Sequence, residues 1–156
     1  MVRRKKHGKA NGDAIDYGPL AGWVGFNLRM AQAAAFQAFS RLASEIGTRP
    51  GRFATLMLIG RNPGISQTAL SRANGRDKSS LTPVLNDLER RGLVCRQRTR
   101  ADQRAYRLSL TAAGRRLLDE LTECARVHER SLDRIIGARE QKSFVRVLKR
   151  IIAEMG

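Results

Sequence analysis

Apolar residues recur at helical spacing along the first part of this chain. The pattern runs from Pro19 to about Ile46, and Phe26, Phe36 and Phe39 lie outside its main stripe. A helix that is apolar on more than one face needs two surfaces to pack against. The pattern therefore predicts a long N-terminal helix that is covered from two sides.

The last third of the chain predicts two further helices. Thr111 is suited to cap a long helix that continues to about Ile136, where Gly137 ends it. A final helix follows, with apolar residues on one broad side from Phe144 to Met155. The first and last helices carry more apolar surface than one small lobe can cover. This excess favours a homodimer over a monomer with a large core.

Shorter elements are predicted between the long helices. An apolar helix over Arg52–Arg61 is ended by the turn Asn62-Pro63-Gly64. The next helix, Gln67–Ala73, has Ser66 as its N-cap and stops at Asn74-Gly75.

The helix that follows has one apolar and one polar face. Asp77 can cap it, and Gly92 ends it. Its apolar stripe, at positions i, i+3, i+4 and i+7, consists of Leu81, Val84, Leu85 and Leu88. Val94–Arg98 and Ala105–Leu110 then alternate as the strands of a hairpin. This order is typical of a winged helix-turn-helix, in which the second helix enters the DNA major groove beside the hairpin, or wing.

The polar face of residues 77–91 has side chains that suit groove recognition. Opposite the apolar stripe lie Ser79, Thr82, Pro83, Asn86 and Arg90. Asn86 can form two hydrogen bonds with adenine, and the Pro83 ring can touch a thymine methyl. Proline costs about 3 kcal/mol inside a helix, and this cost would fall if the helix began effectively near Ser80, with Pro83 in its first turn. An ordinary solvated helix face is the alternative interpretation.

Positive charge is concentrated at two places. The formal net charge is +16 over 156 residues, which favours nucleic acid as the partner. Residues 1–9 contain several basic residues and no acid, within a segment, 1–18, that we expect to be a disordered tail. The hairpin region has one acid, Asp102, among seven arginines: Arg90, Arg91, Arg96, Arg98, Arg100, Arg104 and Arg107. Arginine donates two parallel hydrogen bonds to phosphate and suits narrow minor grooves.

From this charge and the polar helix face we expect a set of DNA-contacting residues. They are Arg72, Arg76, Lys78, Ser79, Ser80, Thr82, Pro83, Asn86, Arg90, Arg98, Arg100 and Arg104.

The chain resembles the MarR family of transcriptional regulators over about residues 20–156. Three motifs carry the resemblance: LTPVLNDLERRGLV at 81–94, Asp102-Gln103-Arg104, and LSLTAAG at 108–114. The resemblance implies a mainly α fold (α+β) in one domain, 19–156. Its helices at 19–48 and 111–156 would interlock in a homodimer, with residues 49–110 as the winged lobe. Two such lobes would straddle a pseudo-palindromic operator, most often as a repressor.

The resemblance also implies roles for two wing residues. Arg104 would enter the minor groove of double-stranded DNA, and Asp102 would orient it, which adds Asp102 to the predicted DNA-contacting residues.

A small organic effector is one signal that the resemblance implies. Between residues 17 and 40 the only charged residue is Arg29, which lies near Trp23, Asn27 and Met30. An arginine among aromatic residues can hold a carboxylate. We therefore expect these four residues to bind an aromatic carboxylate or its acyl-CoA thioester. The alternative is that Arg29 is the solvent edge of its helix.

An oxidant is the other signal. The oxidant-sensing branch of the family has a reactive cysteine near the start of the first helix, and this chain has none there. Cys95 and Cys124 are interpreted as small core residues, and a thiol-based redox-responsive regulator remains an alternative.

Other functional classes are disfavoured. The sequence has two scattered histidines, His7 and His128, and lacks a Cys/His cluster, a Ser–His–Asp set and a Gly-rich phosphate loop. We therefore expect no enzyme activity, no metal and no cofactor. A membrane span and a signal peptide are also not expected. Cys95 and Cys124 lie in different predicted elements and do not suggest a disulfide framework, which favours the reducing cytoplasm. A sequence-indifferent architectural DNA-binding protein would have the same charge and remains an alternative.

Overall fold

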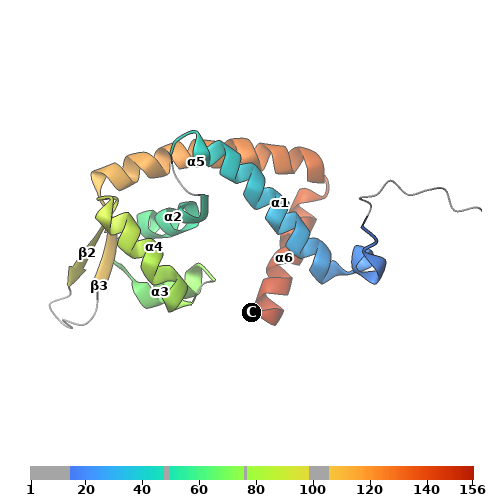
Figure 1. Cartoon of the computed structure of the whole chain (residues 1–156), viewed down its shortest axis with the longest axis horizontal. Helices are drawn as coiled ribbons and strands as arrows, with labels where there is room; N and C mark the ends of the chain where they lie inside the picture. Colours follow the sequence, from blue (N-terminus) through green and yellow to red (C-terminus); the bar gives the residue numbers. More distant parts are fainter. Residues whose placement is uncertain (1–14, 48–49, 76, 99–105) are drawn as a thin grey trace, which may run out of the picture. The chain divides into compact units, whose positions relative to one another are not determined.

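The computed structural model describes residues 15–47, 50–75, 77–98 and 106–156 (Figure 1). The chain forms two compact units, 1–35 and 36–156, and helix α1 (Val24–Ser44) runs from one into the other. The other elements, in chain order, are the 3₁₀ turns η1 (Gly18–Gly22) and η2 (Pro50–Arg52), α2 (Phe53–Arg61), β1 (Ile65–Ser66), α3 (Gln67–Ala73), α4 (Lys78–Arg90), β2 (Val94–Arg98), β3 (Tyr106–Leu110), α5 (Ala112–Ile136) and α6 (Gln141–Met155).

In the first unit, the long helix begins later than the sequence predicts. Pro19 lies in η1, and Trp23 then has an extended backbone, so α1 begins at Val24. The side-chain amide of Asn27 donates to the carbonyl oxygens of Ala21 at 3.0 Å and Trp23 at 2.9 Å. These bonds satisfy carbonyl groups at the change of backbone direction. An apolar repeat does not register such a break, which explains the difference.

The second unit contains a three-stranded antiparallel sheet of order β1-β3-β2. Its β2–β3 hairpin is the one that the alternation predicts, with Val94 opposite Leu110 and Arg98 opposite Tyr106. The prediction of only two strands is wrong, because Ile65–Ser66 pairs with β3. A strand of two residues is too short to have a recognisable alternation.

Leucine dominates the core of the second unit. The largest fully buried apolar side chains are Leu56, Ile59, Leu70, Leu81, Leu85, Leu88, Leu108 and Leu121. Three of these come from the predicted inward stripe of α4, while Val84 is half-buried. Each buried leucine contributes about 1.5–3 kcal/mol relative to an exposed one. Their burial fixes which face of α4 points outward.

Pro83 lies inside α4, because the helix begins after the predicted Asp77 cap and not near Ser80. Asp77 caps the helix, and its carboxylate accepts a hydrogen bond from the Ser80 amide. The first helical residue is therefore Lys78, and Pro83 lies in the second turn. Its missing N–H leaves the Ser79 carbonyl without the usual intrahelical donor. The cap and the leucine stripe outweigh this cost.

The second long helix begins as predicted. Thr111 caps α5 by accepting a hydrogen bond from the Gly114 amide, and Gly137, with φ of 88°, ends the helix. A Cβ at Gly114 would lie 2.0 Å from the carbonyl oxygen of Leu93, so only glycine fits there. Among the described helices, none has the length and apolar character to cross a membrane.

Candidate nucleic-acid interface

The N-terminus of α4 is organised around Asp77. Its carboxylate accepts hydrogen bonds from the Ser79 hydroxyl at 2.5 Å and the Ser80 amide at 2.7 Å. These bonds, the Ser79 one first, lower the pKa of Asp77 from 3.8 to about 2. The Ser80 hydroxyl donates to the Asp77 carbonyl oxygen. Both serine hydroxyls, predicted to contact DNA, thus donate within the helix cap.

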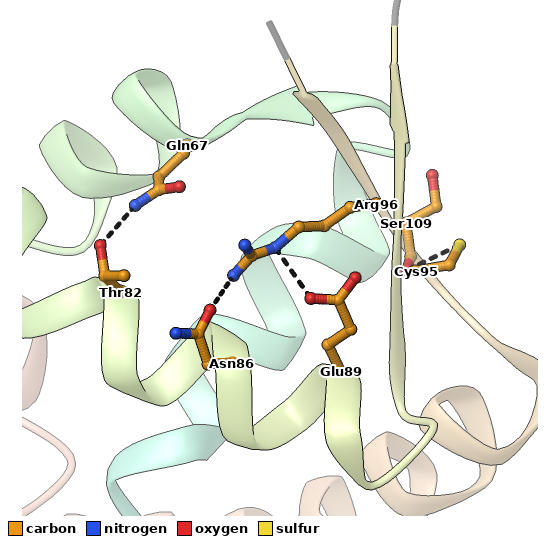
Figure 2. Close-up of polar contacts among 7 residues, drawn as sticks. All are labelled: Gln67, Thr82, Asn86, Glu89, Cys95, Arg96 and Ser109. Carbon is orange, nitrogen blue, oxygen red and sulfur yellow. Dashed lines mark hydrogen bonds and ion pairs between the residues drawn. The ribbon is translucent and has the colours of Figure 1, made fainter. Parts of the chain in front are cut away.

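Thr82, in the middle of the exposed face of α4, is held by the preceding helix (Figure 2). Gln67 at the start of α3 donates its amide to the Thr82 hydroxyl oxygen at 2.9 Å. The hydroxyl itself donates to the Lys78 carbonyl oxygen at 2.7 Å. Because its proton is used within the helix, Thr82 offers a partner chiefly its methyl group, which suits a thymine methyl.

Asn86, one turn further along α4, is held from the wing. The Nη2 of Arg96 in β2 donates to the Asn86 Oδ1 at 2.7 Å, and the Arg96 Nε lies 3.3 Å from the Glu89 carboxylate (Figure 2). The Arg96 side chain is only 18% exposed. One arginine therefore joins the wing to two positions on α4. The arginine count predicted a phosphate-binding surface and did not register this internal role.

Asp87 joins α4 to the segment before α2. Its carboxylate forms ion pairs with Arg52, which is 12% exposed, and with Arg90, which is 78% exposed. The Arg90 contact measures 2.6 Å. The Arg52 pair is not apparent from the sequence, because the two residues are far apart along the chain. Arg90 keeps its exposed position while sharing this carboxylate.

Of the other described arginines of the hairpin, one is exposed to solvent and one forms a structural hydrogen bond. The Arg98 guanidinium is exposed and lies 5.8 Å from the centroid of the Tyr106 ring. Arg107 donates to the Gly64 carbonyl oxygen at 3.0 Å and so ties β3 to the turn before β1. Arg72 and Lys78 are exposed as well, so these predicted DNA contacts are, like Arg98, accessible to solvent.

Four predicted DNA-contacting residues lie outside the described residues: Arg76, Arg100, Asp102 and Arg104. Their roles, including that of Arg104 in a minor groove, stay predictions.

The four predicted effector residues all belong to the first unit. Arg29 lies with its guanidinium 5.4 Å from the centroid of the Phe26 ring and 3.4 Å from the Met30 sulfur. Trp23 is 60% exposed. Asn27 uses its amide protons on backbone carbonyl oxygens, so it supports the helix start. The structure brings Arg29 and Met30 together and gives Asn27 a local structural role.

Both cysteines are half-buried rather than fully enclosed. The Cys95 thiol lies 3.5 Å from the Ser109 carbonyl oxygen across the hairpin, and the Cys124 thiol lies 3.8 Å from the Leu42 carbonyl oxygen. His128, one turn after Cys124, packs its ring 5.6 Å from that of Phe39. Its Nε2 is buried without a hydrogen-bond partner among the described residues. From the sequence, His128 is interpreted as a scattered histidine, although its i, i+4 spacing from Cys124 places both residues on the same side of α5.

Comparison with known sequences identifies a family match and a relative that extends over nearly the whole chain. The sequence profile of the MarR family matches residues 46–105. A protein of Thauera aromatica described as a transcriptional regulatory protein for the hcr operon is 36% identical, over 95% of this chain and 92% of that protein.

Comparison with solved structures gives the same fold. The transcriptional repressor CouR bound to a 23-mer DNA duplex superposes with a TM-score of 0.83 at 28% identity, over 90% of this chain and 99% of CouR. CouR bound to p-coumaroyl-CoA gives 0.81, also at 28% identity, over 92% and 100%. PcaV from Streptomyces coelicolor, in complex with its natural ligand, gives 0.80 at 28% identity, over 92% and 99%.

Proposed function

This chain belongs to the MarR family of DNA-binding transcriptional regulators, and on that basis we propose that it is a repressor that leaves its operator when an aromatic acid, or the acyl-CoA thioester of one, binds. The family is one of regulators rather than enzymes. The proposed operator is pseudo-palindromic double-stranded DNA in the cytoplasm. The protein would bind it as a homodimer, with one winged lobe on each half-site.

The observation that carries this proposal is the arrangement of α4. Three buried leucines fix its orientation, and neighbouring elements hold two side chains of its outward face. Such tethering reduces the conformational entropy that a side chain loses when it contacts a base. The solved complex of CouR with a DNA duplex, at a TM-score of 0.83, supports the same use of this fold.

We assign the contacts as follows. Thr82, Pro83 and Asn86 would meet base edges in the major groove. The phosphate contacts would come from Arg72, Arg76, Lys78, Arg90, Arg98 and Arg100, with Arg104, oriented by Asp102, in the minor groove. Ser79 and Ser80 stay in the proposed set, and each would donate to a phosphate only after its hydroxyl releases Asp77.

The homodimer is supported by the C-terminal helix. Phe144, Val147 and Ile152 on α6 are all exposed in the single chain. Exposed apolar side chains on one helix are typical of an interface with a second copy, which would hold two α4 helices at a spacing set by the dimer.

The effector class is supported by two findings. CouR was solved with p-coumaroyl-CoA, an aromatic acyl-CoA. In this chain Arg29, beside the Phe26 ring and Met30, offers a planar cation for a carboxylate or phosphate. Trp23, Asn27, Arg29 and Met30 remain the proposed contacts.

An electrophoretic mobility assay tests the proposal. The promoter DNA beside the gene for this protein is titrated against shuffled DNA, and specific binding is expected to be about 10³-fold tighter or more. We expect p-coumaroyl-CoA, p-coumarate or benzoate to release the DNA. Arg104→Ala should weaken binding while the fold is retained. Equal affinity for both DNAs would favour an architectural protein. Release by peroxide, abolished by serine at positions 95 and 124, would favour the redox alternative.

A further inference from the structure

Among the described residues of the wing, Arg96 has a largely buried side chain, 18% exposed, that touches the outward face of α4. We propose that Arg96 is a positioning residue that turns the Asn86 side chain so that it presents its NH₂ group to the DNA, and thereby selects guanine rather than adenine at one operator position. The inference depends on the proposed placement of α4 in the major groove.

The geometry of Arg96 fixes both ends of its side chain. Its backbone lies opposite the fully buried Leu108 in the hairpin, so the base of the side chain is anchored in the sheet. Its Nε forms an ion pair with the Glu89 carboxylate at 3.3 Å, without a hydrogen bond among the described residues. A second nitrogen of the same group donates to the Asn86 Oδ1 at 2.7 Å. Because guanidinium is planar and rigid, the ion pair with Glu89 directs the bond to Asn86.

The contact changes what Asn86 can recognise. Two-bond pairing with adenine requires the amide oxygen to accept from N6 and the amide nitrogen to donate to N7. In this structure the oxygen already accepts a bond from a charged donor, which is stronger than a neutral one. The amide nitrogen lies on the side away from Arg96 (Figure 2). Asn86 therefore offers donors.

Base chemistry then predicts the preference. Guanine presents two adjacent acceptors, N7 and O6, in the major groove, whereas adenine places the N6 donor beside N7 and cytosine presents a donor. An NH₂ group meets two acceptors on guanine and one acceptor beside a donor on adenine. If Asn86 keeps the orientation that it has in the free protein, we expect the position that it contacts to prefer guanine most and cytosine least.

The experiment is selection of bound duplexes from a library randomised over the operator half-site, followed by sequencing. Four proteins are compared: the natural chain, Asn86→Ala, Arg96→Met and Arg91→Leu. Asn86→Ala identifies the position that Asn86 reads. Arg91 is an exposed residue just after α4, so Arg91→Leu removes the same charge without touching Asn86.

We expect Arg96→Met to shift the preference at that position from guanine to adenine by about fivefold or more, since a good two-bond pair discriminates bases by about 1–3 kcal/mol. Arg91→Leu should lower affinity and leave the preference unchanged. If Arg96→Met does not fold, as judged by thermal melting, the double variant Arg96→Met/Glu89→Gln leaves no unpaired carboxylate and should show the same shift.

The outcomes separate this inference from the proposed function. An unchanged motif in folded Arg96 variants, an adenine preference in the natural chain, or no effect of Asn86→Ala overturns the role of Arg96 while the regulator stands. A natural chain that enriches no motif at all overturns the proposed function, and the inference with it.

Discussion

Helices α4 and α6 have similar lengths and similarly one-sided apolar patterns, yet the chain covers only one of them. Leu81, Leu85 and Leu88 on α4 are fully buried. Within the described residues, α6 buries no side chain, and Ile152 and Met155 remain 70% and 84% exposed. The two helices therefore obtain their stability from different sources.

The difference indicates that α4 contributes to the core of its own lobe, whereas α6 is available for association. The lobe around α4 has its own core, so the outward face of α4 is set before any partner binds. The apolar side of α6 has water as its neighbour in the single chain, which is unfavourable by about 25 cal/mol per Å² of apolar area. A second chain is the proposed cover, so damage to α6 should alter association, and damage to α4 should alter folding.

The largest expected effect comes from α4, the helix whose apolar side lies in the core. Leu85→Ala leaves a cavity beneath α4 and should lower the free energy of unfolding by about 2–5 kcal/mol. Urea denaturation measures it, and Val84→Ala, at a half-buried neighbour, should cost less. A loss below 1 kcal/mol would contradict the assignment of Leu85 to the core.

The second-largest expected effect tests the exposed apolar side of α6. Ile152→Asp puts a charge where we propose an apolar dimer contact, and should raise the dimer dissociation constant about 100-fold, or about 2.8 kcal/mol. Sedimentation at several concentrations measures this constant. Ala153→Asp introduces the same charge at the next, exposed residue, on the opposite side of the helix, and should have little effect. Equal behaviour of the two variants would remove α6 from the interface.

Elements that depend on local signals were predicted well from the sequence. Ser66, Asp77 and Thr111 were identified as N-caps, and their side chains accept the expected backbone hydrogen bonds. Capping depends on a few neighbouring residues, so sequence alone suffices. The start of α1 and the short strand β1 were missed, because they depend on backbone bonds that apolar periodicity does not register.

The sequence predicts which residues surround the candidate site, but not which of their side chains contact one another. The sequence indicated the outward face of α4 and its arginine-rich surroundings, but not that Arg96 contacts Asn86 and Glu89. Likewise Arg52 pairs with Asp87 across a large sequence separation. Such pairings follow from tertiary packing, which places distant residues together. A count of arginines therefore overestimates how many are available to phosphate.

Asp87 offers a smaller test of how α4 is held, because two arginines share its carboxylate. Arg52→Met removes the partner that is 12% exposed and should lower the free energy of unfolding by about 2 kcal/mol, since it leaves a partly buried charge less compensated. Arg90→Met removes the partner that is 78% exposed and should cost no more than about 0.5 kcal/mol. Denaturation at two salt concentrations compares them. Equal losses of stability in the two variants would mean that burial does not make the Arg52–Asp87 pair stronger than the Arg90–Asp87 pair.

The smallest effect concerns the ends of the two helices. Asp77 caps α4, whereas the side chain of Glu140, the residue before α6, makes no capping hydrogen bond. Because the pKa of Asp77 falls from 3.8 to about 2 on folding, its ionised form stabilises the folded state. That contribution is complete above about pH 4 and is lost as the pH falls through 2. Asp77→Asn keeps a capping side chain but cannot ionise, so the natural chain should lose stability relative to this variant between pH 4 and pH 2.

Urea denaturation at pH 4, 3 and 2 measures this relative loss. Ser79→Ala should raise the pKa of Asp77 toward 3.8, since the Ser79 hydroxyl is its main cause, and should shrink the difference between the natural chain and a non-ionising cap. Glu140→Gln removes a carboxylate at the uncapped helix and should follow the natural chain. If Asp77→Asn and Glu140→Gln respond to acid alike, the Asp77 cap is not what distinguishes α4 from α6, and burial of its leucines alone accounts for the contrast.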